Sequence, residues 1–280
     1  MGKSNVFSMS RMVRRVIIAS VFLSCNALFW VGVYYAFLKA PETCFDAKQN
    51  QNEQGVDCGG VCTKACFEAV VGRDIQLKEV AFVPAGDGRY DVLGKIFNVN
   101  DDIGASLFQY TFELHDGSGA ILATRSGEGY VLPQETKSLI ELNLETAGTP
   151  VLATLKITDV TWERLSGYRE RPSINIYQKR YNQVTEGFGY SEAYGLLSNE
   201  SAYDFRSILV KVILRDASGL PLAMNMTEMR TVRAQESRDF KLVWPIPFPG
   251  MVEQIDMEID ADVYHSDNFV RQYFPGGTPR

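Results

Sequence analysis

Hydrophobic residues first predominate at residues 16–38, a stretch of 23 residues that contains no charged side chain. As an α-helix this run would be about 34 Å long, enough to cross a hydrocarbon core of about 30 Å. The apolar region of a cleaved signal peptide is shorter, about 7 to 15 residues, and precedes a site of small residues. We therefore predict a transmembrane helix at residues 16–38. A cleaved signal peptide and a lipoprotein processed at Cys25 are the alternatives.

Beyond residue 70 the pattern changes to an alternation of hydrophobic and polar positions. In residues 106–114, apolar side chains occupy every second position from Phe108 to Leu114, as in a strand with one buried face. Residues 138–144 and 255–259 alternate in a similar way. Clusters of Gly, Asp and Ser between such segments are typical of turns. Because no stretch here has the period of an amphipathic helix, the pattern predicts an all-β fold.

Three short motifs recur in the same order at an offset of about 100 residues. The pairs are residues 94–98 with 195–199, 114–119 with 214–219, and 134–135 with 235–236. Such a repetition indicates a duplicated unit. Short strands with frequent turns in units of this size predict two tandem Ig-like β-sandwiches, at residues 69–167 and 168–272, arranged in series as a rod.

The order of the motifs along each unit is similar to that of the small Ig-like sandwiches of the FxLYD kind, which occur in bacterial envelope proteins. Each unit has a Gly-x-hydrophobic-x-Asn motif, a long alternating strand and an Asp-x-x-Gly turn. The FxLYD motif itself is not evident in this chain. We expect Asn98 and Asn199, which close the first motif, to end a strand or to bond a neighbouring loop.

Positive charge is concentrated before the predicted span, and the first acidic residue of the chain is Glu42. The basic residues that precede the span are Lys3, Arg11, Arg14 and Arg15. Positive residues beside a span remain on the cytoplasmic side. We therefore predict a cytoplasmic stub at residues 1–15 and, from about residue 40, an extracytoplasmic segment in the periplasm or at the cell surface.

The net charge of the chain is unevenly distributed. The whole chain carries −6 and its first 40 residues carry +5, so the remaining residues carry −11. An acidic ectodomain repels phosphate backbones, which argues against nucleic acid as a partner.

Four of the five cysteines, Cys44, Cys58, Cys62 and Cys66, lie close together in the sequence. Outside the cytoplasm, such an even cluster is typical of disulfides, and four cysteines allow three pairings. So short a segment cannot bury a core, so cross-links must hold it. Zinc bound by four thiolates is the alternative, but the spacing C-x13-C-x3-C-x3-C lacks the two close pairs usual for zinc. We predict a disulfide module at residues 39–68.

Residues 44–66 resemble a short cysteine-rich module of bacterial surface and secreted proteins, with a core of roughly C-x-D-G-x-x-N-x-x-E-x-G-V-D-C-G-G-x-C-x-x-C. Ala47 stands where the module usually has Gly, and the last gap is one residue longer. The matching residues are Asp46, Asn50, Glu53, Gly55, Val56, Asp57, Cys58, Gly59, Gly60 and Cys62. The resemblance implies a bacterial envelope location and implies no activity.

Oxygen-bearing side chains are frequent in the same segment. Asp46, Asn50, Glu53 and Asp57 form a set that suits Ca²⁺, a hard cation that prefers carboxylate and carbonyl oxygens. The alternative is that these residues are solvated turn residues.

The sequence contains no recognisable catalytic motif. Its two histidines, His115 and His265, are far apart in the chain, and the repeat places Arg215 opposite His115, as expected for an exposed polar position. A nucleophile elbow, a phosphate-binding loop and paired metal-ligand spacing are all absent from the sequence. We therefore predict a protein without catalytic residues or cofactors. An enzyme with a site at the junction of the two units, near residues 168–180, is the alternative.

Aromatic residues crowd the start of the second unit. The set comprises Tyr177, Tyr181, Phe188, Tyr190 and Tyr194. Such residues either pack in the core or form an exposed patch, a common surface for binding protein or glycan.

The prediction is a single-pass bacterial envelope protein with a flexible tail at residues 273–280. Its expected role is non-catalytic, in adhesion or envelope assembly, with a protein or an envelope polymer as partner. A glycan- or peptide-binding module is the first alternative, and the junction enzyme is the second.

Overall fold

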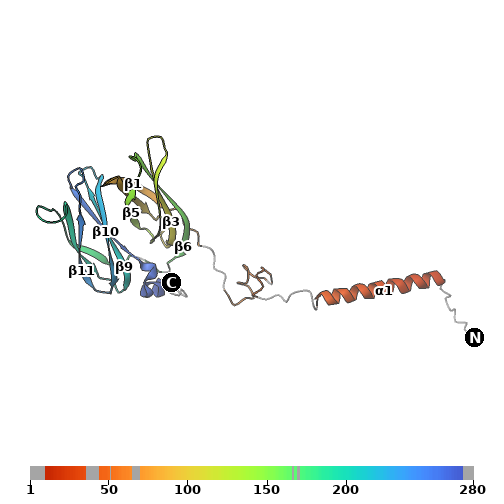
Figure 1. Cartoon of the computed structure of the whole chain (residues 1–280). Helices are drawn as coiled ribbons and strands as arrows, with labels where there is room; N and C mark the ends of the chain where they lie inside the picture. Colours follow the sequence, from red (N-terminus) through yellow and green to blue (C-terminus); the bar gives the residue numbers. More distant parts are fainter. Residues whose placement is uncertain are drawn as a thin grey trace, which may run out of the picture. The chain divides into compact units, whose positions relative to one another are not determined.

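The computed structural model of the chain describes residues 10–35, 44–50, 52–64, 70–165, 167–168 and 171–273. The chain divides into two compact units, Met1–Ala69 and Val70–Arg280. The first unit holds an apolar helix and a cysteine-rich loop, and the second unit holds the β-structure (Figure 1).

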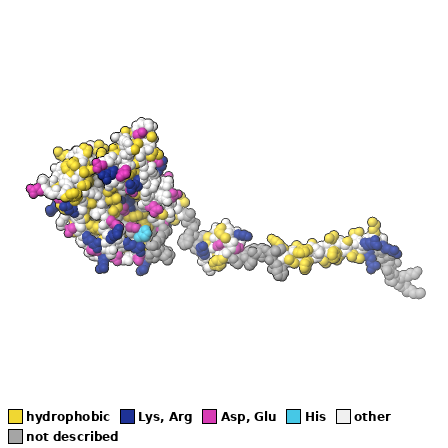
Figure 2. Space-filling model, in the orientation of Figure 1, with side chains coloured by type: hydrophobic (Ala, Val, Ile, Leu, Met, Phe, Trp, Pro, Cys, Tyr) yellow, Lys and Arg dark blue, Asp and Glu magenta, His cyan; other side chains and the backbone are white. Residues whose placement is uncertain are grey.

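Helix α1 (Arg11–Val33) is the apolar element of the first unit. Its first turn is capped by Ser10, whose hydroxyl accepts a hydrogen bond from the Val13 amide. Figure 2 shows hydrophobic side chains along the helix and basic side chains at its N-terminal end. By length and composition α1 can cross a membrane, and a signal sequence has the same properties. The predicted apolar helix is confirmed, and it is compatible with a single-pass anchor.

The helix begins at Arg11, before the predicted start at Val16. Hydropathy marks only the apolar part of a helix, and Arg is itself a good helix former, so the helical backbone extends into the basic segment. Leu38, the predicted end, lies outside the described residues. Cys25 is a free cysteine on this helix.

The described residues of the second unit form twelve strands and two short helical elements. In chain order these are β1 (Gln76–Gly86), β2 (Arg89–Phe97), β3 (Ile103–His115), β4 (Ile121–Val131), β5 (Thr136–Glu145), β6 (Leu152–Arg164), β7 (Ile174–Gln183), β8 (Ser191–Asn199), β9 (Phe205–Arg215), β10 (Pro221–Val232), β11 (Ser237–Trp244), β12 (Gln254–Ala261), η2 (Val263–His265) and α2 (Asp267–Tyr273).

The strands form four three-stranded antiparallel sheets, ordered β1-β2-β5, β4-β3-β6, β11-β8-β7 and β10-β9-β12. The arrangement of β1–β6 recurs in β7–β12, with each strand replaced by the strand six places later in the chain. The predicted all-β fold of Ig-like sandwiches is confirmed. Strands β1–β6 lie within residues 69–167, and β7–β12 lie within residues 168–272.

Two hydrophobic clusters form the interiors of the two sandwiches. In the first, Phe108 and Phe112 of β3 are fully buried together with Ile96 of β2. In the second, Val210 of β9 packs with Trp244 of β11 and other inward-facing residues. Most members of each cluster lie on the strands of its own sandwich, where alternating strands place their apolar side chains, and Leu132 and Leu165 of the first sandwich join the second cluster.

A third hydrophobic cluster joins the two sandwiches. Val83, Leu93 and Ile140 of sheet β1-β2-β5 pack against Ile213 and Met224 of sheet β10-β9-β12. The four sheets therefore lie in layers, and Figure 1 shows them in succession from β11, through β10 and β9, then β1 and β5, to β3 and β6. The two middle sheets are buried on both faces. Strands β2 and β9 therefore contain runs of consecutive buried residues, whereas a strand with one solvent-facing side would expose every second residue.

This packing differs from the predicted rod. The sandwiches form one compact unit, joined face to face by apolar side chains that a rod of separate domains would leave exposed.

The recurring Gly-x-hydrophobic-x-Asn motif has the same structural role in both sandwiches. The Asn98 side-chain amide donates hydrogen bonds to the carbonyls of Ile103 and Leu132, at 2.8 and 3.0 Å. The Asn199 amide donates to the carbonyls of Tyr203 and Arg233, both at 2.8 Å. Both asparagines are fully buried, so each clamps two neighbouring loops. This agrees with the role expected for them.

The glycine that opens each motif is required by packing. A Cβ atom on Gly94 would lie 2.3 Å from a methyl carbon of Leu155, and one on Gly195 would lie 2.6 Å from the Phe240 ring. Only glycine allows these side chains to cross the strand so closely.

The C-terminal helix α2 was not expected from the sequence. Its seven residues are too few to show a helical period, but Phe269 is fully buried in the second core. Tyr273 is the last residue of α2, and its ring lies 4.6 Å from that of Phe269, so the predicted flexible tail does not include it. Residues 274–280 lie outside the described part of the chain.

Candidate functional site

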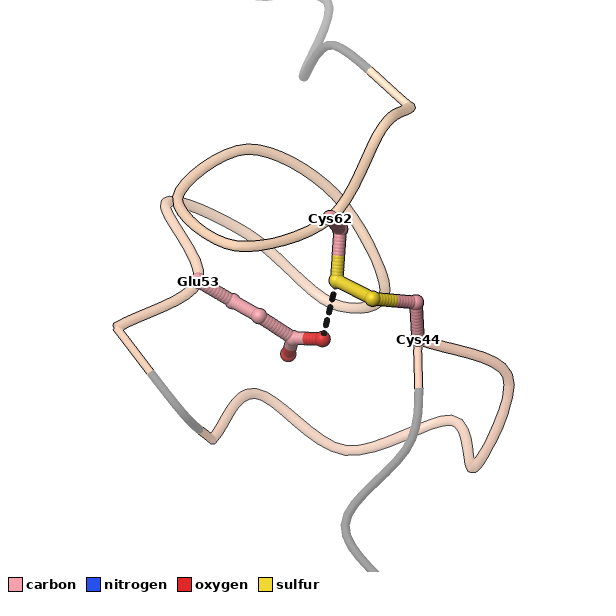
Figure 3. Close-up of side chains that lie close together, drawn as sticks. All are labelled: Cys44, Glu53 and Cys62. Atoms are coloured by element: carbon pink, nitrogen blue, oxygen red, sulfur yellow. Dashed lines mark hydrogen bonds between the residues drawn. A yellow bond between two sulfur atoms is a disulfide. The ribbon is translucent and has the colours of Figure 1, made fainter.

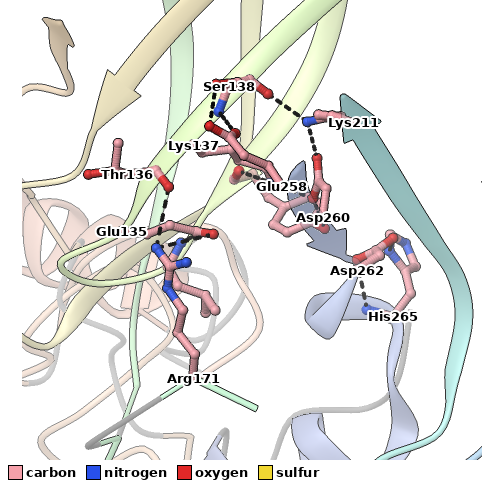
Figure 4. Close-up of polar contacts among 12 residues, drawn as sticks. Glu135, Thr136, Lys137, Ser138, Arg171, Lys211, Glu258, Asp260, Asp262 and His265 are labelled. Atoms are coloured by element: carbon pink, nitrogen blue, oxygen red, sulfur yellow. Dashed lines mark hydrogen bonds and ion pairs between the residues drawn. The ribbon is translucent and has the colours of Figure 1, made fainter. Parts of the chain in front are cut away.

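The junction of the two sandwiches holds a cleft of about 490 Å³. Strand β5 of the first sandwich and strands β7 and β12 of the second contribute to its lining, and each of these is an edge strand of its sheet. The charged residues that line it are Lys95, Glu135, Lys137, Arg171, Lys179, Lys211, Glu258 and Asp260. Most of them are drawn in Figure 4. A volume of this size is usual for a small-molecule site.

Two buried lysines share one carboxylate at the floor of the cleft. The Nζ atoms of Lys137 and Lys211 each lie 2.6 Å from a different oxygen of Asp260. Their side chains are only 5% and 4% exposed. The Tyr130 hydroxyl also donates a hydrogen bond to Asp260. Because Lys137 belongs to the first sandwich and the other two charges to the second, the network links the sandwiches (Figure 4).

The environment shifts the protonation equilibria of this network. Burial by itself would raise the pKa of Asp260, but the charges of Lys137 and Lys211 outweigh burial and hold that pKa well below its ordinary value. Burial lowers the pKa of Lys137, against the opposing attraction of Asp260. Burial and the neighbouring Asp260 both raise the pKa of Tyr130. The carboxylate is therefore ionised at neutral pH and the phenol is neutral.

The other two carboxylates of the cleft bind groups of the protein itself. Glu258 accepts hydrogen bonds from the amide and the hydroxyl of Ser138, at 3.1 and 2.9 Å. Glu135 accepts a hydrogen bond from the Leu132 amide at 2.6 Å. These contacts hold the start of β5 and the turn before it in place.

The cleft overlaps the region that the sequence suggests as a possible junction site, residues 168–180, of which Arg171 and Lys179 are charged residues of the lining. The floor residues Lys137, Lys211 and Asp260 were not predicted from the sequence. One signal was available for Lys211, which interrupts the apolar run of β9 and is buried there. The meeting of Lys137 with Asp260 depends on sheet packing and has no local signal.

The predicted aromatic patch divides between the core and the surface. Tyr181 and Tyr190 pack against the second core, with ring centroids 6.4 Å from Trp244 and 5.2 Å from Phe248, respectively. Phe188, in the loop between β7 and β8, is 82% exposed. The structure therefore does not bring all five aromatic residues to one surface.

The two remaining members of the patch, Tyr177 and Tyr194, are tied to acidic neighbours. The Tyr177 hydroxyl donates to Glu200 at 2.6 Å, and the Tyr194 hydroxyl donates to Glu192. The ammonium of Lys241 lies 5.3 Å from the centre of the Tyr194 ring. Tyr177 is 45% exposed, and ligand binding by these tyrosines stays a prediction.

The cysteine-rich loop contains a disulfide between Cys44 and Cys62 (Figure 3). Cys58 is disulfide-bonded as well, and Cys66 lies outside the described residues. The Glu53 carboxylate is buried and lies 3.0 Å from the Cys62 sulfur. Cys44, Glu53 and Cys62 bring potential metal ligands together, but sulfurs that are bonded to each other are not thiolates. The zinc alternative is therefore wrong for this pair.

The proposed calcium ligands form hydrogen bonds within the same loop. Asp57 accepts hydrogen bonds from the amides of Asp46 and Ala47, both at 3.0 Å. Asp46 in turn accepts a hydrogen bond from the side-chain amide of Asn50, and Glu53 accepts one from the backbone amide of Asn50. These contacts give the oxygens a role in shaping the loop, and Ca²⁺ binding stays a prediction.

The two histidines occupy different settings. His115 Nδ1 lies 3.3 Å from the Gly119 carbonyl, and Arg215, its counterpart, donates to the Gly219 carbonyl at 2.8 Å. Arg215 is buried and pairs with Glu79 of the first sandwich at 2.8 Å, so the expectation of an exposed polar position was wrong. A position near a turn becomes buried here because another sheet covers it.

His265 pairs with Asp262 at 2.6 Å. Asp262 also caps helix η2 through the His265 amide, so this pair serves the local structure.

No protein-family model matches the chain. The curated proteins likewise contain no match. Among solved structures, a transglutaminase from red sea bream is 14% identical and has a TM-score of 0.22, over 69% of this chain and 29% of the transglutaminase. The calcium-binding domain CBD12 of CALX1.1 is 10% identical and has a TM-score of 0.18, over 59% of this chain and 75% of that domain. At these TM-scores neither likeness supports an inference about function.

Proposed function

We propose that the chain is a membrane-anchored interaction protein of a bacterial cell envelope, with residues from about 40 onwards outside the cytoplasm. Its role is non-catalytic, in adhesion or in the assembly of the envelope. We also propose that its two sandwiches are copies of one duplicated unit.

The Cys44–Cys62 disulfide, which follows the apolar helix in the chain, is the observation that carries this proposal. Disulfides persist in oxidising compartments and are rare in the cytoplasm. The basic residues before α1 favour the same orientation, since positive charge stays on the cytoplasmic side. The resemblance of the cysteine-rich loop to modules of bacterial surface proteins supports the proposed location in a bacterial envelope.

A glycan- or peptide-binding module is the second candidate. The junction cleft favours it, because the cleft has the volume of a small-molecule site and combines apolar walls with charged groups. If an envelope substrate is identified, the same cleft is the candidate site for its catalytic turnover.

The proposal is tested by crosslinking in intact cells, followed by pull-down through a C-terminal tag and mass spectrometry. The matched control is a tagged chain that ends at residue 69, which keeps the helix and the cysteine-rich loop and lacks the β-unit. Partners captured by the full chain and not by the control support an adhesion or assembly role. Capture of the same proteins by both chains, or of the monomer alone, contradicts it.

A further inference from the structure

The cations of the junction cleft fall into two groups that differ in how they are paired. At the floor, Lys137 and Lys211 are held at 2.6 Å from Asp260. At the mouth, Arg171 lies 3.6 Å from Glu135 and Lys95 lies 3.6 Å from Glu258. These longer separations exceed hydrogen-bond distance, so the mouth cations keep donors available.

Lys179 is the least compensated cation of the cleft. It is exposed, it lines the cleft from β7, and within the described part of the chain its side chain forms no hydrogen bond or ion pair. Arg171, which precedes β7 and also lines the cleft, makes long contacts of 3.4 Å with the Thr136 carbonyl and 3.6 Å with Glu135. A guanidinium fork and an ammonium are thus both presented to the same space.

The carboxylates of the cleft offset only part of this positive charge. Asp260 is shared by two lysines, Glu258 pairs with Lys95, and Glu135 pairs with Arg171. The lining contains five cationic side chains and three carboxylates, so positive charge is in excess. The chain after residue 40 has a net charge of −11, so the excess positive charge of the cleft is opposite in sign to the net charge of the segment that contains it. A concave site with one sign of charge concentrates ions of the opposite sign.

The two floor lysines differ in how fully their ammonium groups are used. Each ammonium has three hydrogens. Lys137 donates to the Tyr130 carbonyl and to Asp260, and Lys211 donates to the Ser138 carbonyl and to Asp260. The Lys137 ammonium also lies 3.2 Å from the centre of the Tyr130 ring, so among the described contacts one hydrogen of Lys211 remains for a further acceptor.

Apart from Thr136 and Asn175, the rest of the lining is apolar. Ile174 and Ile176 of β7 and Met257 and Ile259 of β12 contribute to the walls. A ligand that fits this lining has an anionic group for the cations and a compact body of carbon atoms for the walls.

We propose that the junction cleft binds a small oxyanion ligand, carrying a carboxylate or a phosphate, which Arg171 and Lys179 hold at the mouth. The bidentate geometry of Arg171 matches both groups. The site lies wholly within residues 95–263, so it does not depend on the membrane role proposed above.

The test is isothermal titration of the full chain in detergent with inorganic phosphate and with glucuronate, which separates the two kinds of oxyanion. Glucose is the uncharged counterpart of glucuronate. The cleft variant is Arg171→Gln with Lys179→Gln, both at exposed positions that leave the core intact. The control variant is Lys156→Gln with Arg164→Gln, which removes two exposed cations from β6, outside the cleft.

We expect phosphate or glucuronate, and not glucose, to bind the unmodified chain. The affinity should fall about tenfold or more in the cleft variant, as expected for loss of charged hydrogen bonds, and change less than about twofold in the control. Binding of phosphate alone identifies a phosphate site, and binding of glucuronate alone identifies a carboxylate site. Absence of binding by either anion at 10 mM, roughly the weak limit for such sites, or an equal loss in both variants, overturns the proposal.

Discussion

Replacement of Asp260 by Asn tests how the two sandwiches are held together. The substitution keeps the shape of the side chain and removes the charge that pairs with Lys137 and Lys211. Two nearly fully buried ammonium groups are then left without a counter-charge. Removing one partner of a buried ion pair costs about 3–5 kcal/mol. Since domains are stable by about 5–15 kcal/mol, we expect Asp260→Asn to lower the free energy of unfolding by a large fraction.

A compensated variant separates the ion network from the packing around it. Asp260→Leu combined with Lys137→Met and Lys211→Met removes all three charges and fills the space with apolar side chains. Replacing a buried ionic cluster by apolar residues of similar volume is often neutral or stabilising. We therefore expect this triple variant to be within about 1–2 kcal/mol of the unmodified chain, or more stable.

The assay is urea unfolding of the full chain in detergent, followed by tryptophan fluorescence. Trp162 packs against the first core and Trp244 lies in the second, so both sandwiches are observed. Asp87→Asn is the control, because Asp87 is an exposed carboxylate whose loss should cost less than about 0.5 kcal/mol. A folded Asp260→Asn variant within about 1 kcal/mol of the unmodified chain would refute the reasoning.

The pH dependence of the same variant gives a second check. The pKa of Asp260 is depressed in the folded state, so its stabilisation is fully present above the unfolded pKa of about 4 and is lost as the pH falls below it. The difference between the unmodified chain and Asp260→Asn should therefore shrink on acidification. A difference that stays constant between pH 7 and pH 3, a range chosen to span roughly that unfolded pKa, contradicts an electrostatic origin.

Three further predictions concern single residues. Burial raises the pKa of Asp91 from 3.8 to about 6, so its ionisation destabilises the fold as the pH rises through this range. Asp91→Asn should raise the free energy of unfolding at pH 8 by up to about 3 kcal/mol and change it little near pH 4, as measured by urea unfolding. Ala47 has a φ of 57°, a left-handed conformation that favours glycine, so Ala47→Gly should stabilise the loop by about 1 kcal/mol, seen as slower cleavage by protease. A side chain at position 195 would collide with Phe240, so Gly195→Ala should lower the thermal unfolding temperature by several degrees, and no change would contradict the packing described.

Features that depend on neighbours in the sequence could be predicted. The apolar run of α1, the alternation in β3, the Asp-x-x-Gly turns and the recurring glycine and asparagine motifs all leave local patterns, and the structure contains each of them. A disulfide in the cysteine cluster could also be predicted, because four closely spaced cysteines follow a predicted membrane span. The pairing of Cys44 with Cys62 was not, because several pairings satisfy the same spacing.

The sequence by itself thus determined an apolar helix, a cross-linked loop and two similar sets of strands. Only the tertiary structure decided that the sandwiches pack face to face, that Arg215 is buried, and that Lys137 and Lys211 meet at Asp260. The physical reason is distance along the chain. An alternating pattern shows that a strand has a buried face, but it does not show which sheet covers that face, and the charges of the cleft come together only when the covering sheet is in place.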